Sequence, residues 1–216
     1  FYTTKRNFSL HEKLLHIATT MTVRFADSVL FTVPWLKEIW MGPYSLHYKD
    51  LHIVPNPMLP QEPAVSTSSK VFLAAGRPMR IKNIAMLKDE VWPQIQREHP
   101  NAILDTEPKG HAEYQEALRH ACAVILPSLS DVSPNSILEA IRYGKPFICT
   151  QDTGLYDEYK ELGMFVDTKN TQELTDAIRT MLTPEGYTEA CHRVQKPVAV
   201  RDAASVARGF RSLLVR

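Results

Sequence analysis

One segment, residues 121–150, constrains the fold more than any other part of the chain. Ala121–Leu126 is an apolar run without polar alternation, as expected of a strand that is buried on both faces. Phe147–Cys149 begins a second run of the same kind. Two buried strands about twenty residues apart leave room for a helix between them, and this arrangement predicts a βαβ unit with parallel strands.

The residues between these strands indicate where the helix begins and ends. Ser133 offers a hydroxyl N-cap, and Pro134 suits the first helical position because that position needs no N–H donor. Gly144 supplies a C-terminal stop, and Pro146 prevents continuation. The helix N-terminus should therefore lie at the carboxyl end of a strand, which is where open parallel sheets usually bind phosphates and nucleotides.

The flanking sequence repeats the alternation of strands and helices. From residue 71 onward we expect strand 71–75, helix 84–98, strand 102–104, helix 112–120, the βαβ unit, helix 156–162, strand 164–166 and helix 171–182. We expect Thr171 to be the N-cap of the last of these helices. This order predicts an α/β fold, in which a parallel sheet carries helices on both faces.

The pattern of the N-terminal residues predicts a region separate from the parallel-sheet domain. Residues 9–25 have the spacing of an amphipathic helix and residues 28–33 that of a strand, and Pro55-Asn56-Pro57 forms a rigid turn. We therefore expect three parts: residues 1–54, a sheet domain over residues 55–190, and a basic C-terminal helix within residues 191–216. Because Phe1 rather than Met opens the chain, we also expect an excerpt of a longer protein.

Composition excludes several classes of partner and compartment. The formal net charge of +1 gives no general case for nucleic acid. The three cysteines form no C-x-x-C pair, which favours a reduced, cytoplasmic compartment. The longest uncharged apolar stretch, within residues 28–36, is too short to cross a bilayer.

Several well-known motifs are absent from the sequence. The eight glycines never fall as G-x-G, and neither G-x-x-x-x-G-K nor H-E-x-x-H occurs. There is also no Asp-x-Asp pair to hold a divalent cation, so we predict no metal site. These absences argue against a dehydrogenase, a P-loop enzyme and a zinc hydrolase.

The first candidate site is a basic loop after the strand at residues 71–75. Gly76 ends that strand, and Arg77 and Lys82 follow before a helix N-terminus. A guanidinium fork, an ammonium and backbone N–H groups together suit a pyrophosphate. The alternative is that these cations are solvated, as basic residues in loops commonly are.

The second candidate site is the pair of acids Asp131 and Glu139. Asp131 lies in the loop before the central helix, and Glu139 shares a helical stripe with Asn135 and Arg142. The stripe either faces a cleft or faces solvent with a weak Glu139–Arg142 ion pair. Spacing alone leaves both interpretations open.

Together these residues resemble a known family. Asp131 and Glu139, eight positions apart, resemble the Glu-x7-Glu region of retaining GT-B glycosyltransferases, in the branch of glycogen synthases and bacterial mannosyl- and glucosyltransferases. Gly76-Arg77 with Lys82 and Asn83 is similar to that family's Gly-Arg-x4-Lys-Gly motif. The resemblance implies the C-terminal, Rossmann-like half of a GT-B fold, preceded by the last helix and strand of the N-terminal acceptor domain.

The resemblance also implies an activity and its residues. The donor would be a UDP-, GDP- or ADP-sugar, transferred with retention and without a metal or other cofactor to a glycan or lipid-linked acceptor. Arg77 and Lys82 would stabilise the departing diphosphate, Glu139 would bind the ribose, and Asp131 would face the donor sugar. The implied donor-binding set is Gly76, Ser133, Pro134, Asn135, Ser136 and Glu139.

Departures from the family pattern favour two alternative functions. Asp131 is one methylene shorter than the usual Glu, and Val132-Ser133-Pro134-Asn135 replaces a glycine-rich loop. The region between Pro100 and His111 has room for one strand and helix fewer than the family has. These features favour a catalytically degenerate nucleotide-sugar-binding module. A non-hydrolysing sugar-nucleotide epimerase shares the architecture and is the other alternative.

The basic helix at the C-terminus has two interpretations. From Cys191 onward six Lys or Arg residues oppose the single acid Asp202. In the family the last helix packs back on the N-terminal domain. A basic amphipathic helix can instead lie on anionic lipid, which would place a cytoplasmic protein at the inner face of the membrane.

Overall fold

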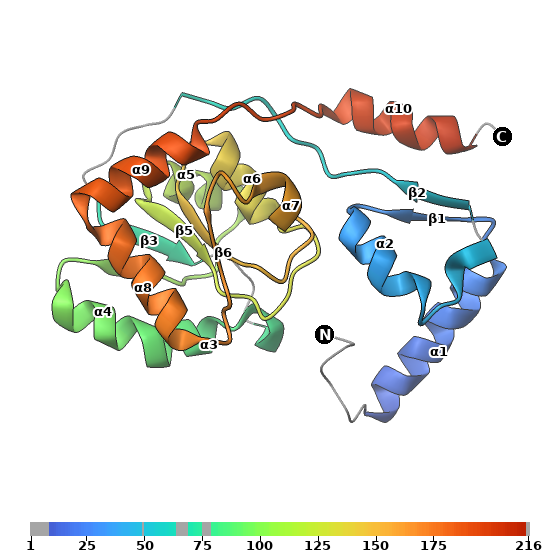
Figure 1. Ribbon diagram of the computed structural model, residues 1–216, viewed down its shortest axis with the longest axis horizontal. Coiled ribbons are helices and arrows are strands. Elements are labelled where there is room, and N and C mark those ends of the chain that lie inside the picture. The colour runs from blue at the N-terminus through green and yellow to red at the C-terminus, as the bar shows by residue number, and fades with distance from the viewer. Residues whose placement is uncertain (1–8, 49, 64–68, 75–78, 215–216) are drawn as a thin grey trace. The chain divides into compact units, whose positions relative to one another are not determined.

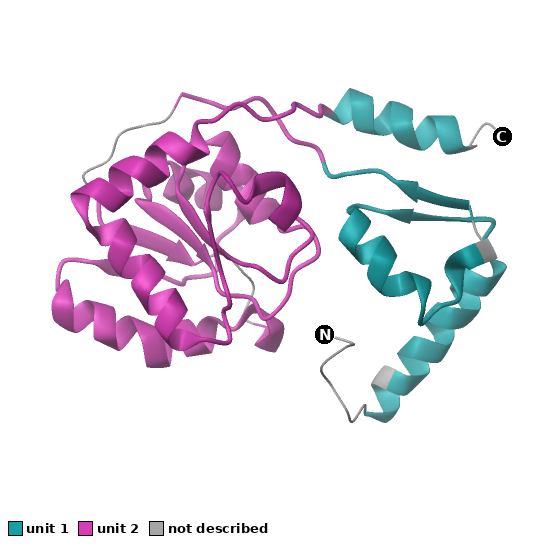
Figure 2. Ribbon diagram, in the orientation of Figure 1, with its two compact units in different colours: residues 1–56, 203–216 teal, residues 57–202 magenta. Residues whose placement is uncertain are grey.

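The computed structural model describes residues 9–48, 50–63, 69–74 and 79–214. These residues form two compact units (Figure 2). Unit 1 combines residues 1–56 with residues 203–216, and unit 2 comprises residues 57–202. Each unit is described by itself.

A five-stranded parallel sheet forms the centre of unit 2 (Figure 1). Its strands are β3 (Val71–Ala74), β4 (Ile103–Asp105), β5 (Ala123–Leu126), β6 (Phe147–Thr150) and β7 (Met164–Val166), in the spatial order β4-β3-β5-β6-β7. Every residue of β5 and β6 is buried, as their unbroken apolar runs predict. The predicted α/β class with a parallel sheet is confirmed.

The order of the strands creates a switch point between β3 and β5. From β3 the chain crosses to β4 on one side, and then returns to add β5 on the other side of β3. Leu73 accordingly pairs in register with Asp105 of β4 and with Val124 of β5. Because consecutive crossovers leave β3 and β5 in opposite directions, the carboxyl ends of these two strands are where sheets of this kind form a ligand-binding crevice.

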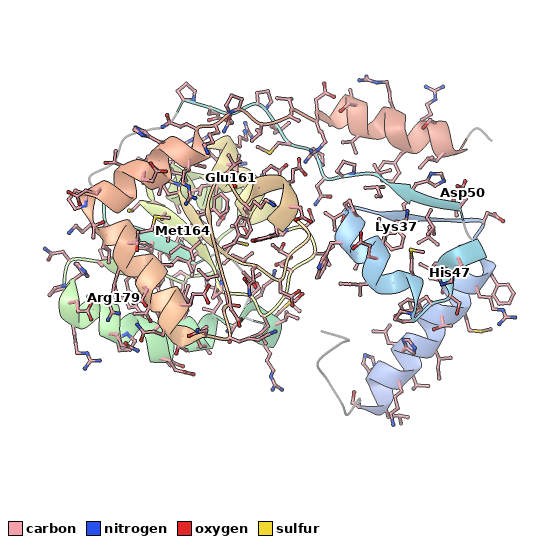
Figure 3. The ribbon with its side chains drawn as sticks, in the orientation of Figure 1. Lys37, His47, Asp50, Glu161, Met164 and Arg179 are labelled. Carbon is pink, nitrogen blue, oxygen red and sulfur yellow. The ribbon has the colours of Figure 1, made fainter. Side chains whose placement is uncertain are left out.

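Helices cover the sheet and build its core. They are α3 (Ile84–Met86), the π-helical turn η3 (Leu87–Val91), α4 (Trp92–Glu98), α5 (His111–His120), α6 (Asn135–Arg142), α7 (Tyr156–Tyr159), α8 (Thr171–Leu182) and α9 (Pro184–Val194). Leu87 and Ile95 pack with Leu174 and Ile178 of α8 in one buried cluster. The Arg179 guanidinium of α8, labelled in Figure 3, also donates to both carboxylate oxygens of Glu98 on α4.

The structure corrects three details of the predicted helices. The helix at residues 84–98 contains a π turn at Leu87–Val91, and Pro93, which follows after Trp92, has no N–H and crowds the carbonyl four residues earlier. Pro134, not Ser133, occupies the N-cap position of α6. The N-cap of α8 is Asn170, not Thr171, because its side chain accepts bonds from the backbone N–H groups of the first turn.

Unit 1 is smaller and has its own cluster. Its elements are α1 (Leu10–Phe25), β1 (Ser28–Phe31), α2 (Pro34–Met41), the 3₁₀ turn η1 (Leu46–Tyr48), β2 (Asp50–Ile53) and α10 (Ala203–Leu214). β1 and β2 form a two-stranded parallel sheet. Val23, Phe31, Tyr44 and Leu46 are its buried core. The predicted helix over residues 9–25 is confirmed.

Candidate functional site

The predicted site residues that the structure describes lie after β3 and β5, the two strands at the switch point. Lys82 ends the short 3₁₀ turn η2 (Arg80–Lys82), and Asp131 lies in the loop between β5 and α6. Glu139 is in the second turn of α6. Gly76 and Arg77 lie outside the described residues.

Lys82 and Asp131 form an ion pair across this crevice. The ammonium Nζ of Lys82 donates a hydrogen bond to Oδ2 of Asp131. The two side chains keep 23% and 13% of their accessible surface, so the pair is shielded but open to a ligand. The site thus carries a cation whose charge is balanced by the acid that follows the neighbouring strand.

Backbone hydrogen bonds fix the loop that carries Asp131. Leu129 N donates to the carbonyl of Ile81 (2.9 Å), which ties this loop directly to the turn of Lys82. Asp131 N donates to the carbonyl of Asp152 (3.0 Å), and Gly154 N donates to that of Val132 (3.1 Å). Segments after β3, β5 and β6 therefore support one another at the carboxyl edge of the sheet.

Asn83 supplies the change of direction between Lys82 and α3. Its backbone has φ 54° and ψ 24°, the left-handed region that Asn tolerates better than most residues. Its amide Nδ2 donates to the carbonyl of Thr168 (3.4 Å), and the buried Thr168 hydroxyl donates to the carbonyl of Ser128 (2.6 Å). This positive φ explains why the resembling motif has glycine at the position of Asn83.

The N-terminus of α6 lies beside the ion pair in sequence. Pro134 is the N-cap, has no N–H of its own, and makes no side-chain capping bond. Ile137 N bonds back to the carbonyl of Pro134 (3.0 Å), so the intrahelical ladder begins there. Asn135 is exposed, and Ser133 and Ser136 are half-buried. A helix N-terminus at this edge favours a bound anion through its dipole.

Glu139 faces residues that the sequence did not single out. Its carboxylate Oε1 lies 3.9 Å from Nδ1 of His111, the first residue of α5. Burial raises the pKa of Glu139, and the nearby His111 and Arg142 act in the opposite direction. The Tyr114 hydroxyl is buried and has no hydrogen-bond partner among the residues that the structure describes, and burial together with Glu139 raises the pKa of that phenol.

Arg142 makes a different contact from the one weighed at the level of sequence. Its guanidinium pairs with Glu62 at 2.7 Å, and not with Glu139 as the solvated interpretation of the stripe requires. Glu139 therefore points to α5 and not along its own helix. His111 could have been found because it follows β4, whose carboxyl end meets those of β3 and β5 at one edge.

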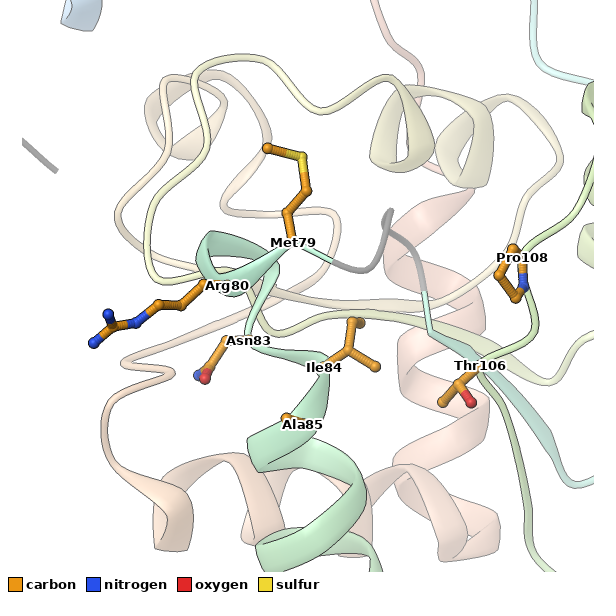
Figure 4. A pocket seen from close by; sticks show the side chains of 7 residues that line it. All are labelled: Met79, Arg80, Asn83, Ile84, Ala85, Thr106 and Pro108. Carbon is orange, nitrogen blue, oxygen red and sulfur yellow. The ribbon is translucent and has the colours of Figure 1, made fainter. Parts of the chain in front are cut away.

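A pocket of about 360 Å³ adjoins these segments (Figure 4). It lies between the turn that carries Lys82 and the loop after β4. The lining residues are Met79, Arg80, Asn83, Ile84, Ala85, Thr106 and Pro108. In Figure 4 Asn83 and Ile84 stand on one side and Thr106 and Pro108 on the other. The sequence did not predict this cavity, because it depends on how two loops distant in sequence approach each other.

Among the described residues, no three His, Cys, Asp or Glu side chains lie close enough together to hold a metal ion. In the same part of the chain, no helix has the length and apolar character needed to cross a membrane.

The architecture defines the class of protein before any comparison. A doubly wound parallel sheet with an ion pair and a helix N-terminus at its switch point is a Rossmann-like arrangement. Residues 105–184 match the family model described as "Glycosyl transferases group 1". No curated protein matches the chain.

Solved structures extend the likeness to almost the whole chain. A sucrose-phosphate synthase from Thermosynechococcus elongatus has a TM-score of 0.66 at 17% identity, and the match covers 94% of this chain and 61% of that one. TarM of S. aureus, in complex with fondaparinux, alpha-GlcNAc-glycerol and UDP, has a TM-score of 0.67 at 13% identity. That match covers 97% of this chain and 47% of TarM. Anabaena HepE, in complex with UDP and glucose, has a TM-score of 0.67 at 16% identity, and the match covers 96% of this chain and 67% of that one.

The family match and the fold agree with each other. The family model matches residues 105–184, and the fold of the chain is similar to that of GT-B glycosyltransferases, as expected of a C-terminal part of that fold. The chain spans 61% of the sucrose-phosphate synthase and 47% of TarM, so it corresponds to a little more or less than half of these proteins. The expected family resemblance is confirmed.

Proposed function

We propose that unit 2 binds a nucleotide sugar and acts as the donor-binding part of a glycosyltransferase. The observation that carries this proposal is the ion pair of Lys82 with Asp131, which joins the segments after β3 and β5 at the switch point, just before α6 in sequence. A cation and a helix N-terminus at one edge of the sheet favour a phosphate-bearing ligand. The family match to residues 105–184 makes a sugar nucleotide the favoured ligand.

The proposed roles are those that the family resemblance implies for these residues. Lys82, together with Arg77, would neutralise the pyrophosphate and stabilise the departing nucleoside diphosphate in place of a metal. Gly76 and the backbone of residues 133–136 would contact the phosphate or the sugar. Glu139, half-buried and beside His111, would accept hydrogen bonds from the ribose hydroxyls.

The related structures suggest the class of donor. HepE was solved with UDP and glucose, TarM with UDP, and starch synthase IV from Arabidopsis thaliana with ADP and acarbose. By analogy we propose a UDP-, GDP- or ADP-sugar as donor and a glycan or lipid-linked acceptor. We further propose transfer with retention, without metal or cofactor, by a cytoplasmic protein that needs an acceptor domain for turnover.

Calorimetry with nucleoside diphosphates tests the donor site. Titration of UDP, GDP and ADP should give saturable binding for at least one of them. Lys82→Ala should weaken that binding by about 10- to 100-fold, because a charged hydrogen bond contributes about 1.5–3 kcal/mol. Lys88→Ala, which removes an exposed lysine of η3, is the matched control and should bind like the wild type. An equal loss in both variants would exclude a specific role for Lys82.

A catalytically degenerate binding module is the second candidate. It is favoured because, among the described residues, only the short strand β4 lies between α4 and α5, and because Asp131 is already paired with Lys82. A panel of nucleotide sugars, assayed with and without glycan acceptors on a protein that also contains the acceptor domain, separates the two. Transfer to an acceptor supports the enzyme; donor binding without turnover supports the module; donor conversion without acceptor indicates an epimerase.

A further inference from the structure

Asp131 is the more rigid partner of the Lys82–Asp131 pair. Its backbone N–H is bonded to Asp152, and its position is paired with Thr153 by an isolated parallel bridge. Its carboxylate is attached through a single methylene, whereas the Lys82 ammonium lies at the end of a flexible four-carbon chain. The geometry of the pair is therefore set by Asp131, and Lys82 adapts to it.

One oxygen of the Asp131 carboxylate is used in the contact with Lys82. Oδ2 accepts a hydrogen bond from the Lys82 ammonium, and both side chains are largely shielded from solvent. An ammonium has three N–H donors, so two remain for phosphate oxygens after one has gone to Asp131. The arrangement thus leaves Lys82 able to bind a ligand while its stem is already held in one orientation.

We propose that Asp131 is a positioning residue, which holds the Lys82 ammonium at the place where a nucleoside diphosphate binds. This inference rests on the proposed function and changes one of its parts, since the resemblance puts the equivalent acid beside the donor sugar. The shorter Asp suits the positioning role, because a Glu would carry its carboxylate one methylene farther into the crevice. Asp131 then acts on the diphosphate only through Lys82.

Removal of the acid distinguishes this role from that of a nearby negative charge. If Asp131 were only such a charge, Asp131→Asn would remove a repulsion and strengthen the binding of an anionic diphosphate. If Asp131 positions Lys82, the same variant frees the lysine stem, and its ordering must be supplied when the ligand binds. The two roles predict changes of opposite sign.

The experiment is a double-mutant cycle measured by calorimetry on the 216-residue chain. The probe is whichever of UDP, GDP and ADP the wild type binds. Asp131→Asn should weaken binding about tenfold, and Lys82→Ala by at least as much. The double variant should bind like Lys82→Ala alone, because Asp131 has no effect once its lysine is gone.

Controls keep folding apart from positioning. Glu189→Gln removes an acid from an exposed i,i+4 pair with Arg193 and should leave binding unchanged. Thermal melts without ligand identify any variant that does not fold, and Asp131→Ser gives the same comparison if the amide is not tolerated.

Three outcomes overturn a proposal, and they do not overlap. If Asp131→Asn binds the diphosphate as tightly as the wild type or more tightly, the positioning role is wrong. If it loses as much affinity in the Lys82→Ala background as in the wild type, Asp131 acts independently of Lys82 and the role is again wrong. If the wild type binds none of the three diphosphates, the proposed function itself fails.

Discussion

Asn83 shows how a single backbone conformation can dictate a residue type. Its φ of 54° is accessible to glycine and asparagine at little cost, whereas a β-branched residue is strained there. We therefore expect Asn83→Gly to keep diphosphate binding and to change the free energy of unfolding by less than about 1 kcal/mol. Asn83→Val should destabilise the chain by about 1–3 kcal/mol. Urea unfolding of both variants checks this, and equal stabilities would contradict it.

Glu139 is expected to make stability depend on pH. Because burial raises the pKa of Glu139, its contribution is fully present below the ordinary carboxyl pKa and is lost as pH rises through the raised value. The charged groups facing it, His111 and Arg142, reduce this effect without reversing it, and the Tyr114 phenol stays neutral in this range. Glu139→Gln is neutral at every pH and should gain stability relative to the wild type as pH rises above the ordinary carboxyl value of 4.5.

Denaturant unfolding of the wild type and Glu139→Gln at several pH values measures this difference. A difference that stays constant with pH would show that the carboxylate costs nothing in the folded state. In the same variant, binding of a nucleoside diphosphate should weaken if Glu139 holds the ribose. A gain in stability together with a loss of affinity is the expected pattern for a binding residue that awaits its ligand.

At the scale of elements, the turn before β7 depends on a glycine. A Cβ on Gly163 would lie 2.2 Å from Cε2 of Phe147, a fully buried residue of β6. Gly163→Ala should therefore destabilise unit 2 by about 1–3 kcal/mol, the usual cost of overpacking. Gly110→Ala is the control, because nothing lies within 4 Å of its Cβ. Thermal unfolding should separate the two variants, and equal melting temperatures would contradict the predicted clash.

Strands and helices could be predicted well, because burial leaves a periodic record in sequence. β5, β6 and α6 all appear where apolar runs and Gly or Pro breakers place them. The N-cap of α8 could not be predicted from sequence, because Asn170 and Thr171 are both good N-cap residues and only the backbone geometry selects Asn170. Helix α9 was not predicted, because its Thr183-Pro184 start follows directly on the end of α8.

The site could be predicted only in part, for a physical reason. Sequence spacing brings Asp131 and Glu139 to one edge, but which partner each carboxylate finds depends on other strands. The contact of Glu139 with His111 and that of Asp131 with Lys82 both join segments separated by one or more crossovers. Arg77, the other expected phosphate ligand, lies outside the described residues and its role stays a prediction.

At the scale of the whole molecule, unit 2 contains the larger hydrophobic core and every site residue that the structure describes. The buried cluster around Phe72, Ile125 and Ile178 lies within residues 57–202. Unit 1 has a smaller core, and several apolar side chains of α1, such as Leu10 and Phe25, are exposed. We therefore expect a segment of residues 57–202 to fold alone and to bind the same diphosphate within about threefold, a difference of less than ~1 kcal/mol. Loss of binding in a folded segment would assign part of the site to unit 1.

The most direct measurement of the central claim is a calorimetric titration of the chain with UDP, GDP and ADP and with their sugar conjugates. We predict saturable binding of at least one diphosphate and of its nucleotide sugar, and a loss of at least about tenfold for both ligands in Lys82→Ala. If no diphosphate binds the wild type, or if Lys82→Ala binds as tightly as the wild type, the crevice between β3 and β5 is not a nucleotide-sugar site.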